Sequence, residues 1–252
     1  MKPEPGTTVE TVKDFWQAHI NNEYYTQERR ATEAYFQEIE DRRYRFHYHL
    51  PEMFARLQGS RGKLLEIGCG IGVDSIQLAK CGFDVTAVDL TENALAVAKE
   101  YAAHRGVNIN FRLGNAEGLE FPDASFDTVY SFGVLHHTPD IEKSVAEVRR
   151  VLKPGGTAHI MLYHSNSLVN LVHWVFRLPY ESPRNLKDHC PVVYTFSRRG
   201  VRELFKDFSD VSVRAEYPFT FGFGPLGTRT PVWFRRPLGR AIGWHLMITA
   251  VR

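Results

Sequence analysis

Between residues 63 and 163 the chain alternates short apolar segments with segments of helical periodicity, and this alternation limits the fold more than any other feature. The apolar segments are short and end near Gly or Asp, as buried strands do. The segments between them carry helix caps such as Thr91 and Gly82. The predicted strands are 63–69, 84–90, 107–115, 126–135 and 157–163, and the predicted helices between them are 74–81, 91–105 and 140–152.

Strands that alternate with helices form a parallel sheet with right-handed crossovers and helices on both faces. We therefore expect an α/β fold with a doubly wound, mostly parallel, seven-stranded Rossmann-like sheet. A helix at 197–208 and strands at 210–217 and 243–252 complete the pattern. In such sheets ligands bind at the carboxyl ends of the strands, so the turns that follow the strands are the candidate site.

One region precedes this pattern, and two regions within it depart from it. Residues 1–58 predict an N-terminal helical cap, and residues 59–252 predict the α/β domain. An apolar helix and a Pro-containing loop at about 164–195 read as an insertion that covers the site. The Gly- and Pro-rich aromatic stretch at about 218–240 predicts a long loop, and loops of that length usually have a function or wrap a neighbouring element.

Composition narrows the function classes. The net charge of +2 gives no overall nucleic-acid footprint, although residues 191–252 hold ten Lys and Arg against four Asp and Glu. That excess indicates a solvated basic face, or a region that binds an anionic surface or an anionic substrate. Three sparse cysteines predict a reducing compartment. With no apolar N-terminal signal and no run long enough to span a bilayer, we expect a cytoplasmic protein.

The stretch LLEIGCGIG (64–72) ends the first strand in a glycine-rich turn. A dinucleotide turn needs a third glycine where Val73 stands, and a P-loop needs a Lys that is missing. Glu66 would repel a pyrophosphate and favour a cation, while Asp89, 21 residues after Gly68, is placed to accept from two ribose hydroxyls. The ligand these residues suit is an adenosine with a cationic, phosphate-free tail, such as S-adenosylmethionine.

Four segments in order resemble the class I S-adenosylmethionine-dependent methyltransferase family, small-molecule type. LLEIGCGIG is similar to the E/D-x-G-x-G-x-G motif, and AVDL to the acidic end of the second strand. GNAEGLEFPDASFDTVYSFGVLHHTPD resembles the family's G-D-A-x-x-L-P-F block, and VRRVLKPGG its helix and turn before strand five. The resemblance covers about residues 60–163 and implies S-adenosylmethionine as the cofactor and methyl transfer as the reaction.

The resemblance also implies roles for matching positions. Gly68 and Gly70, with Cys69 between them, let the backbone approach the methionine moiety. Asp89 would hold the ribose, with Leu90 beside the adenine. Asn115 stands where the family usually has an Asp that contacts the adenine amino group, and its amide oxygen can accept the same bond. The remaining cofactor candidates are Glu66, Ala116 through its backbone amide, Ser131 near the sulfonium, and Tyr25 from the cap.

On the acceptor side, His136 and His137 follow the fourth strand. The resemblance implies that a histidine here serves as general base for a hydroxyl acceptor, with His136 as the first candidate and His137 as the second. Tyr24, Tyr163 and His164 are candidate substrate contacts, and no metal site is expected. The segment SFGV lacks the N/D-P-P-Y/F motif of base-nitrogen methylation, so a small-molecule acceptor without nucleic acid is favoured. N- or C-methylation of a small metabolite or lipid-like acceptor, or a nucleic-acid-modifying or binding role, remain alternatives, and the oligomeric state is left open.

Overall fold

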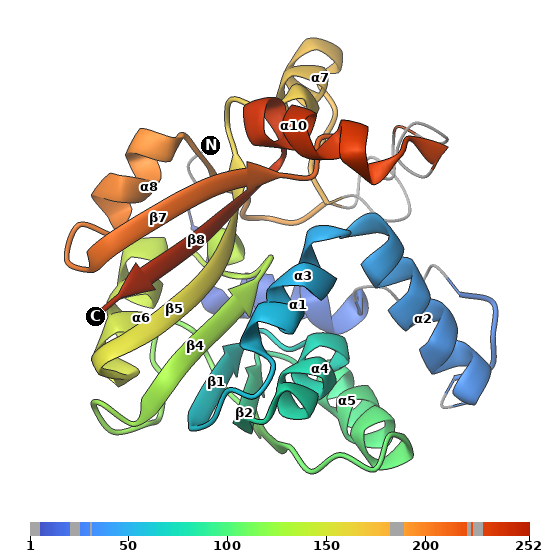
Figure 1. Ribbon diagram of the computed structural model, residues 1–252, viewed down its shortest axis with the longest axis vertical. Coiled ribbons are helices and arrows are strands. Elements are labelled where there is room, and N and C mark those ends of the chain that lie inside the picture. The colour runs from blue at the N-terminus through green and yellow to red at the C-terminus, as the bar shows by residue number, and fades with distance from the viewer. Residues whose placement is uncertain (1–5, 21–25, 31, 182–188, 221–222, 224–228) are drawn as a thin grey trace.

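The computed structural model describes residues 6–20, 26–30, 32–181, 189–220, 223 and 229–252. Its centre is a single sheet with the strand order β3-β2-β1-β4-β5-β8-β7, to which the short β6 is added beside β5 (Figure 1). The strands are β1 (Lys63–Ile67), β2 (Asp84–Asp89), β3 (Asn110–Leu113), β4 (Phe126–Phe132), β5 (Leu152–His164), β6 (Thr195–Phe196), β7 (Ser209–Glu216) and β8 (His245–Val251).

The sheet is parallel from β3 through β5, and β8 runs antiparallel to both β5 and β7. Chain order and spatial order diverge between β1 and β4, so the ends of these two strands flank the crevice where a doubly wound sheet binds ligands. The prediction of a doubly wound, mostly parallel α/β sheet is confirmed.

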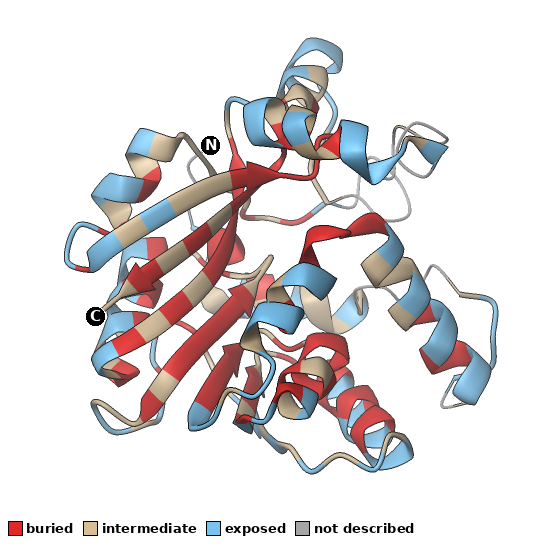
Figure 2. Ribbon diagram, in the orientation of Figure 1, coloured by how far each residue is buried: buried red, intermediate tan, exposed pale blue. Residues whose placement is uncertain are grey.

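Helices cover both faces of the sheet. They are α1 (Val9–Ala18), α2 (Glu33–Phe46), α3 (His49–Leu57), α4 (Val73–Cys81), α5 (Glu92–His104), α6 (Ile141–Val151), α7 (Leu168–Phe176), α8 (Arg198–Leu204) and α10 (Val232–Ile242), with a 3-10 turn at Leu135–His137. Figure 2 shows that the strands at the centre of the sheet and the helix sides that face them are buried. Among the described residues no helix has the length and apolarity to cross a membrane.

Local sequence explains the helix boundaries. α4 begins after Gly72 and ends at Gly82, both in the left-handed conformation. The Asp140 carboxylate caps α6 by accepting from the Lys143 amide at 2.9 Å. Thr91 lies at the N-cap position of α5, yet its hydroxyl donates to Asp89 at 2.8 Å instead of capping the helix. The predicted cap residue therefore serves the turn after β2.

The prediction of a long loop over 218–240 is wrong in its second half, because α10 occupies residues 232–242. Pro237 and Gly239 inside this segment argued against a helix. A side chain at Gly239 would meet the Tyr48 hydroxyl at 3.0 Å and the Tyr217 amide nitrogen at 3.2 Å. The glycine therefore allows α10 to lie close to the end of β7, and this packing outweighs the unfavourable helix propensity.

Candidate active site

The glycine turn between β1 and α4 forms the floor of the site. The Gly68 and Cys69 amides both donate to the Val88 carbonyl, at 2.8 and 3.0 Å, which fixes the turn to β2. Gly68 has φ +72°, and a Cβ there would lie 2.2 Å from a Val134 methyl carbon. Gly70 has φ +53° and open space where its Cβ would be. One glycine is thus needed for packing, and the other leaves room for a ligand.

Asp89, at the end of β2, stabilises this turn and faces the same space. One carboxylate oxygen accepts from the Gly70 amide at 2.8 Å, and the other accepts from the Thr91 amide at 3.0 Å and hydroxyl at 2.8 Å. A carboxylate has about four lone-pair positions, so at least one stays available to a ligand hydroxyl. Asp89 therefore combines a structural role in the turn with acceptor capacity toward the cavity.

Glu66, the carboxylate of β1 before the turn, is buried and hydrogen-bonded to the Ser75 hydroxyl. Burial, assisted by the neighbouring Asp74 carboxylate, raises the pKa of Glu66 to about 8. Burial also raises the pKa of Asp89. A cation bound beside these groups would favour their charged forms, so the floor of the site is better suited to a cationic ligand than to a phosphate.

A buried ion pair attaches the N-terminal cap to this floor. The Arg43 guanidinium of α2 forms a two-pronged pair with the Asp74 carboxylate in the first turn of α4. Asp74 also accepts from the Tyr130 hydroxyl at 2.7 Å and the Tyr44 hydroxyl at 3.2 Å. Removing one partner of such a pair leaves a buried charge without compensation, so the contact fixes the position of the cap.

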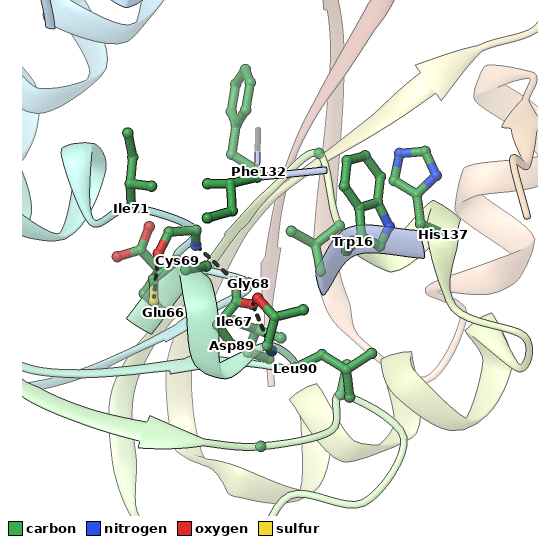
Figure 3. Close-up of a pocket in the computed structure, with 18 of the residues that line it drawn as sticks. Trp16, Glu66, Ile67, Gly68, Cys69, Ile71, Asp89, Leu90, Phe132 and His137 are labelled. Atoms are coloured by element: carbon green, nitrogen blue, oxygen red, sulfur yellow. Dashed lines mark hydrogen bonds between the residues drawn. The ribbon is translucent and has the colours of Figure 1, made fainter. Parts of the chain in front are cut away.

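The turn, the strand ends and the cap enclose a cavity with about 1060 Å³ of empty space, part of it open to solvent (Figure 3). Nine of the residues singled out from the sequence line it, namely Glu66, Gly68, Cys69, Gly70, Asp89, Leu90, Asn115, Ala116 and His137. The structure therefore brings most of the predicted cofactor residues to one place.

Helix α1 also contributes to the cavity, and the sequence analysis missed these residues. Val12 and Trp16 of α1, and His19 and Ile20 directly after it, line the cavity and recur in the sequence at the spacing of one helix face. α1 is held over the site by an ion pair between Lys13 and Glu92 of α5, at 2.9 Å. The helical spacing of these four residues was the signal that could have found them.

The two histidines of the 3-10 turn differ in position. His137 lines the cavity, and its ring lies edge-on to Trp16 at a centroid distance of 5.4 Å (Figure 3). Its Nδ1 donates to the Val192 carbonyl at 2.8 Å, which leaves Nε2 unprotonated in the neutral ring. Burial lowers the pKa of His137, so the neutral form dominates near pH 7.

His136 is fully buried behind its neighbour and is not among the described residues that line the cavity. Its ring packs on Tyr163 at a centroid distance of 3.9 Å. The preference for His136 as the base is therefore not supported, since a base must reach the cavity and His137 is the member of the pair that does.

Three other predicted residues have structural partners outside the cavity lining. The Ser131 hydroxyl donates to the Ile67 carbonyl at 3.0 Å and ties β4 to β1. The Tyr163 hydroxyl donates to Glu181, and His164 Nδ1 donates to the Gly243 carbonyl at 2.9 Å. These contacts give Ser131, Tyr163 and His164 structural roles, and the three are not among the described residues that line the cavity, so their ligand contacts stay predictions. The predictions for Tyr24 and Tyr25 lie outside the described residues.

A cluster of rings forms the wall beyond Phe132, a residue that lines the cavity. His47 and His245 stack at 5.4 Å, and the His49 ring lies 5.6 Å from His245. Both ring nitrogens of His49 and Nδ1 of His245 have no hydrogen-bond partner within the described part of the chain. Burial lowers the pKa of His47 to about 3 and the pKa values of the other two well below normal. This wall is polar but uncharged at neutral pH.

Comparison with known proteins agrees with this site. Residues 65–160 match the family described as "Methyltransferase domain". The chain is 36% identical over 94 residues to a ubiquinone biosynthesis O-methyltransferase from Sinorhizobium fredii, covering 37% of this chain and 38% of the relative. It is 38% identical over 97 residues to a sterol 24-C-methyltransferase from Gibberella zeae, covering 37% of this chain and 26% of that relative. The matches thus span about two fifths or less of the relatives' length.

A solved structure from Thermotoga maritima, described as an S-adenosylmethionine-dependent methyltransferase and possible histamine N-methyltransferase, shares the fold over 95% of this chain and 99% of its own, with a TM-score of 0.62 and 18% identity. Residues 65–160 thus match a methyltransferase-domain family and the chain shares the fold of an S-adenosylmethionine-dependent methyltransferase, and family and fold together imply S-adenosylmethionine as the cofactor. The named relatives methylate different kinds of acceptor, so the shared domain leaves the acceptor open.

The residues present fit this cofactor. The space beside Gly70 accepts a close backbone approach, the Glu66 carboxylate suits a positive charge, and Asp89 retains capacity to accept from hydroxyls. No phosphate-binding lysine or third glycine is needed for such a ligand. The fit therefore rests on the donor and acceptor chemistry of the cavity as well as on the motif.

Proposed function

We propose that the protein transfers a methyl group from S-adenosylmethionine to a hydroxyl oxygen of a small molecule, with His137 as the general base. The observation that carries this proposal is the position of His137. It is a buried neutral imidazole that lines the cofactor cavity and has its Nδ1 proton committed to a backbone carbonyl. An O-methylation releases a proton, and this ring is built to accept one.

When bound, the cofactor would supply a methyl group activated by its sulfonium, and the acceptor oxygen would take that methyl group as it gives up its proton. In the proposed arrangement Asp89 accepts from the ribose hydroxyls, Leu90 and Asn115 lie at the adenine, and the Gly68–Gly70 backbone faces the methionine part. Glu66 provides a negative partner for the positive tail. The protein contributes orientation and exclusion of water, which are the main sources of rate in such a displacement.

His137 takes the acceptor proton at Nε2 in this scheme. The Val192 carbonyl holds the ring in the required tautomer, and it also becomes a better partner as the ring gains positive charge. Because burial keeps the pKa of His137 below its usual value, the base form is ready at neutral pH. General-base assistance of this kind contributes about 100- to 10,000-fold in rate.

The acceptor would occupy the side of the cavity between Trp16, Phe132 and His137. Trp16 and Phe132 offer aromatic surface, and the histidine wall behind Phe132 offers neutral polar groups. The cap helix α1 covers this side and favours a small molecule over a polymer. We also propose a cytoplasmic location, supported by the three cysteines, which are all free and buried. We propose that the protein has no nucleic-acid partner.

N-methylation of an amine is the second candidate. Aromatic rings at Trp16 and Phe132 would attract an ammonium group. A neutral amine needs no base before it attacks, so this reaction would depend much less on His137. The two candidates are therefore separable by one substitution.

The test is a screen of hydroxyl, amine and carbon acceptors with methyl-labelled cofactor, followed by kinetics of His137→Asn and His136→Asn. Asn keeps a donor for the Val192 carbonyl but has no titratable nitrogen. We expect His137→Asn to lower kcat about 100-fold or more with cofactor affinity unchanged, and to abolish the acid limb of the kcat profile. His136→Asn should leave that limb in place. A His137→Asn enzyme with normal turnover on a hydroxyl acceptor would refute the base assignment.

A further inference from the structure

Exposed apolar side chains gather on two helices outside the active site. The described part of the chain exposes nine large hydrophobic side chains, and eight of them lie on α7 with its C-terminal extension or at the start of α10. We call these eight the aromatic face, and they are Leu171, Trp174, Val175, Phe176, Leu178, Val232, Trp233 and Phe234. Exposed apolar side chains gathered in such numbers mark an interaction surface.

The two helices lie at the same end of the molecule (Figure 1). Ile242 at the end of α10 and Leu171 and Trp174 of α7 line one shallow groove, so the helices are neighbours. Figure 2 shows exposed residues on both helices. Trp174 and Trp233 are 75% and 77% exposed, far beyond what their apolar area favours in water.

The two segments that carry the aromatic face contain Arg and no acidic residue. Residues 165–180 and 217–252 contain no Asp or Glu, and the two stretches together hold six Arg. Of these, Arg177, Arg229 and Arg240 are exposed. α7 itself has nine residues, none of them Asp, Glu, Lys or Arg. Exposed Trp and Phe flanked by Arg without acidic residues is the composition of a surface that rests on an anionic lipid interface.

A second copy of the chain is the main rival occupant. In a two-fold dimer through this face, Arg177 and Arg240 would approach their own copies, and the two segments that form the face have no carboxylate of their own to neutralise them. An anionic bilayer supplies that negative charge, and its interfacial region is where Trp side chains are preferred. Charge complementarity therefore selects the lipid surface over self-association.

We propose that the aromatic face docks the protein peripherally on anionic membranes. α7 follows directly from β5, whose carboxyl end lies at the ligand-binding edge of the sheet, so docking places this edge near the bilayer. This proposal stands independently of the methyl acceptor. Its bearing on the proposed function is that an apolar acceptor dissolved in the membrane would be within reach.

The test is co-sedimentation of the full chain with vesicles of phosphatidylcholine alone or of phosphatidylcholine and phosphatidylglycerol in equal parts. We expect binding to the anionic vesicles, weak binding to the neutral ones, and release by added salt. The double variant Trp174→Ser/Trp233→Ser should lose at least about tenfold in affinity for the anionic vesicles, because it removes the largest exposed apolar surface. Leu113→Ser is the matched control, since Leu113 is the ninth exposed residue, 51% exposed on β3, and its loss should change nothing.

Circular dichroism and cofactor titration of each variant establish that the fold and the cofactor site are retained. Equal sedimentation of wild type and double variant, or no sedimentation of the wild type with anionic vesicles, would overturn the proposal. So would a stable wild-type dimer in solution that the double variant converts to a monomer, because the aromatic face would then be a subunit interface. Failure of the methyl-acceptor screen would leave these readouts untouched.

Discussion

Substitution by Ala at two neighbouring glycines, Gly68 and Gly70, separates the packing of the turn from its ligand. Both residues have positive φ, +72° and +53°, a conformation that costs an Ala about 1–2 kcal/mol. At Gly68 the new methyl would lie 2.2 Å from Val134, and overpacking of this kind adds about 1–3 kcal/mol. At Gly70 the new methyl meets nothing and enters the cavity.

We therefore expect Gly68→Ala to lower the free energy of unfolding by about 2–5 kcal/mol and Gly70→Ala by about 1–2 kcal/mol. The loss of cofactor affinity should follow the opposite order, with the larger loss at Gly70. Gly70→Ala should lose at least about tenfold, because the methyl occupies space that the cofactor backbone contacts need. Urea unfolding measures the first quantity, and isothermal titration with S-adenosylmethionine on the folded variant measures the second.

A compensating change tests the cause of the instability. Val134→Gly removes every Val134 side-chain atom that a Cβ at Gly68 would meet. In a double-mutant cycle, Gly68→Ala should therefore cost less in the Val134→Gly background than alone. If Gly70→Ala destabilises the fold as much as Gly68→Ala while cofactor affinity stays normal, the open space beside Gly70 is not the cofactor site and the reasoning fails.

Two pH-dependent predictions follow from the buried titratable groups. Because the pKa of Glu66 is about 8 without a cation, cofactor binding at pH 7 should release a proton, and binding should tighten as pH rises toward 8. Calorimetry in buffers of different ionisation enthalpy measures this proton release. Glu66→Gln should abolish the release. Burial lowers the pKa of His47 to about 3 and that of His159 to about 4, below the usual 6.5, so the unfolded chain binds protons that the folded chain does not. The stability contributed by each group should be fully present above pH 6.5 and fall by about 1.4 kcal/mol per pH unit as pH drops toward its folded pKa. In His47→Phe and His159→Phe this fall, measured from urea midpoints, should be less steep. An unchanged slope would contradict the prediction.

The sheet and the cofactor floor were predictable from the sequence because local patterns determine them. Buried parallel strands read as short apolar runs, and their helices carry recognisable caps. The glycine turn was predictable since its spacing, with Glu66 before it and Asp89 on the next strand, is a local requirement of the ligand. Nine predicted residues accordingly meet at one cavity.

The residues on the acceptor side of the cavity were harder to predict, for a different reason. His136 and His137 lie in a 3-10 turn, where neither the strand nor the helix period tells which ring faces inward. Trp16 reaches the cavity from a helix far away in the sequence, so only tertiary packing places it there. The orientation of Ser131, in contrast, follows from a local pattern. Phe132 lines the cavity, and because side chains alternate along a strand, Ser131 points to the other face.

The charge distribution along the chain gives the two ends of the molecule different partners. Residues 1–190 carry twenty-one Lys and Arg against twenty-five Asp and Glu, and they supply the buried carboxylates Glu66, Asp74 and Asp89 beside the cofactor cavity. Residues 191–252 carry the excess of Arg, part of which surrounds the aromatic face. Figure 1 shows α4 and α5 of the cofactor side at the end of the molecule opposite α7 and α10. An anionic surface would therefore attract the α10 end more strongly than the α4 and α5 side of the molecule.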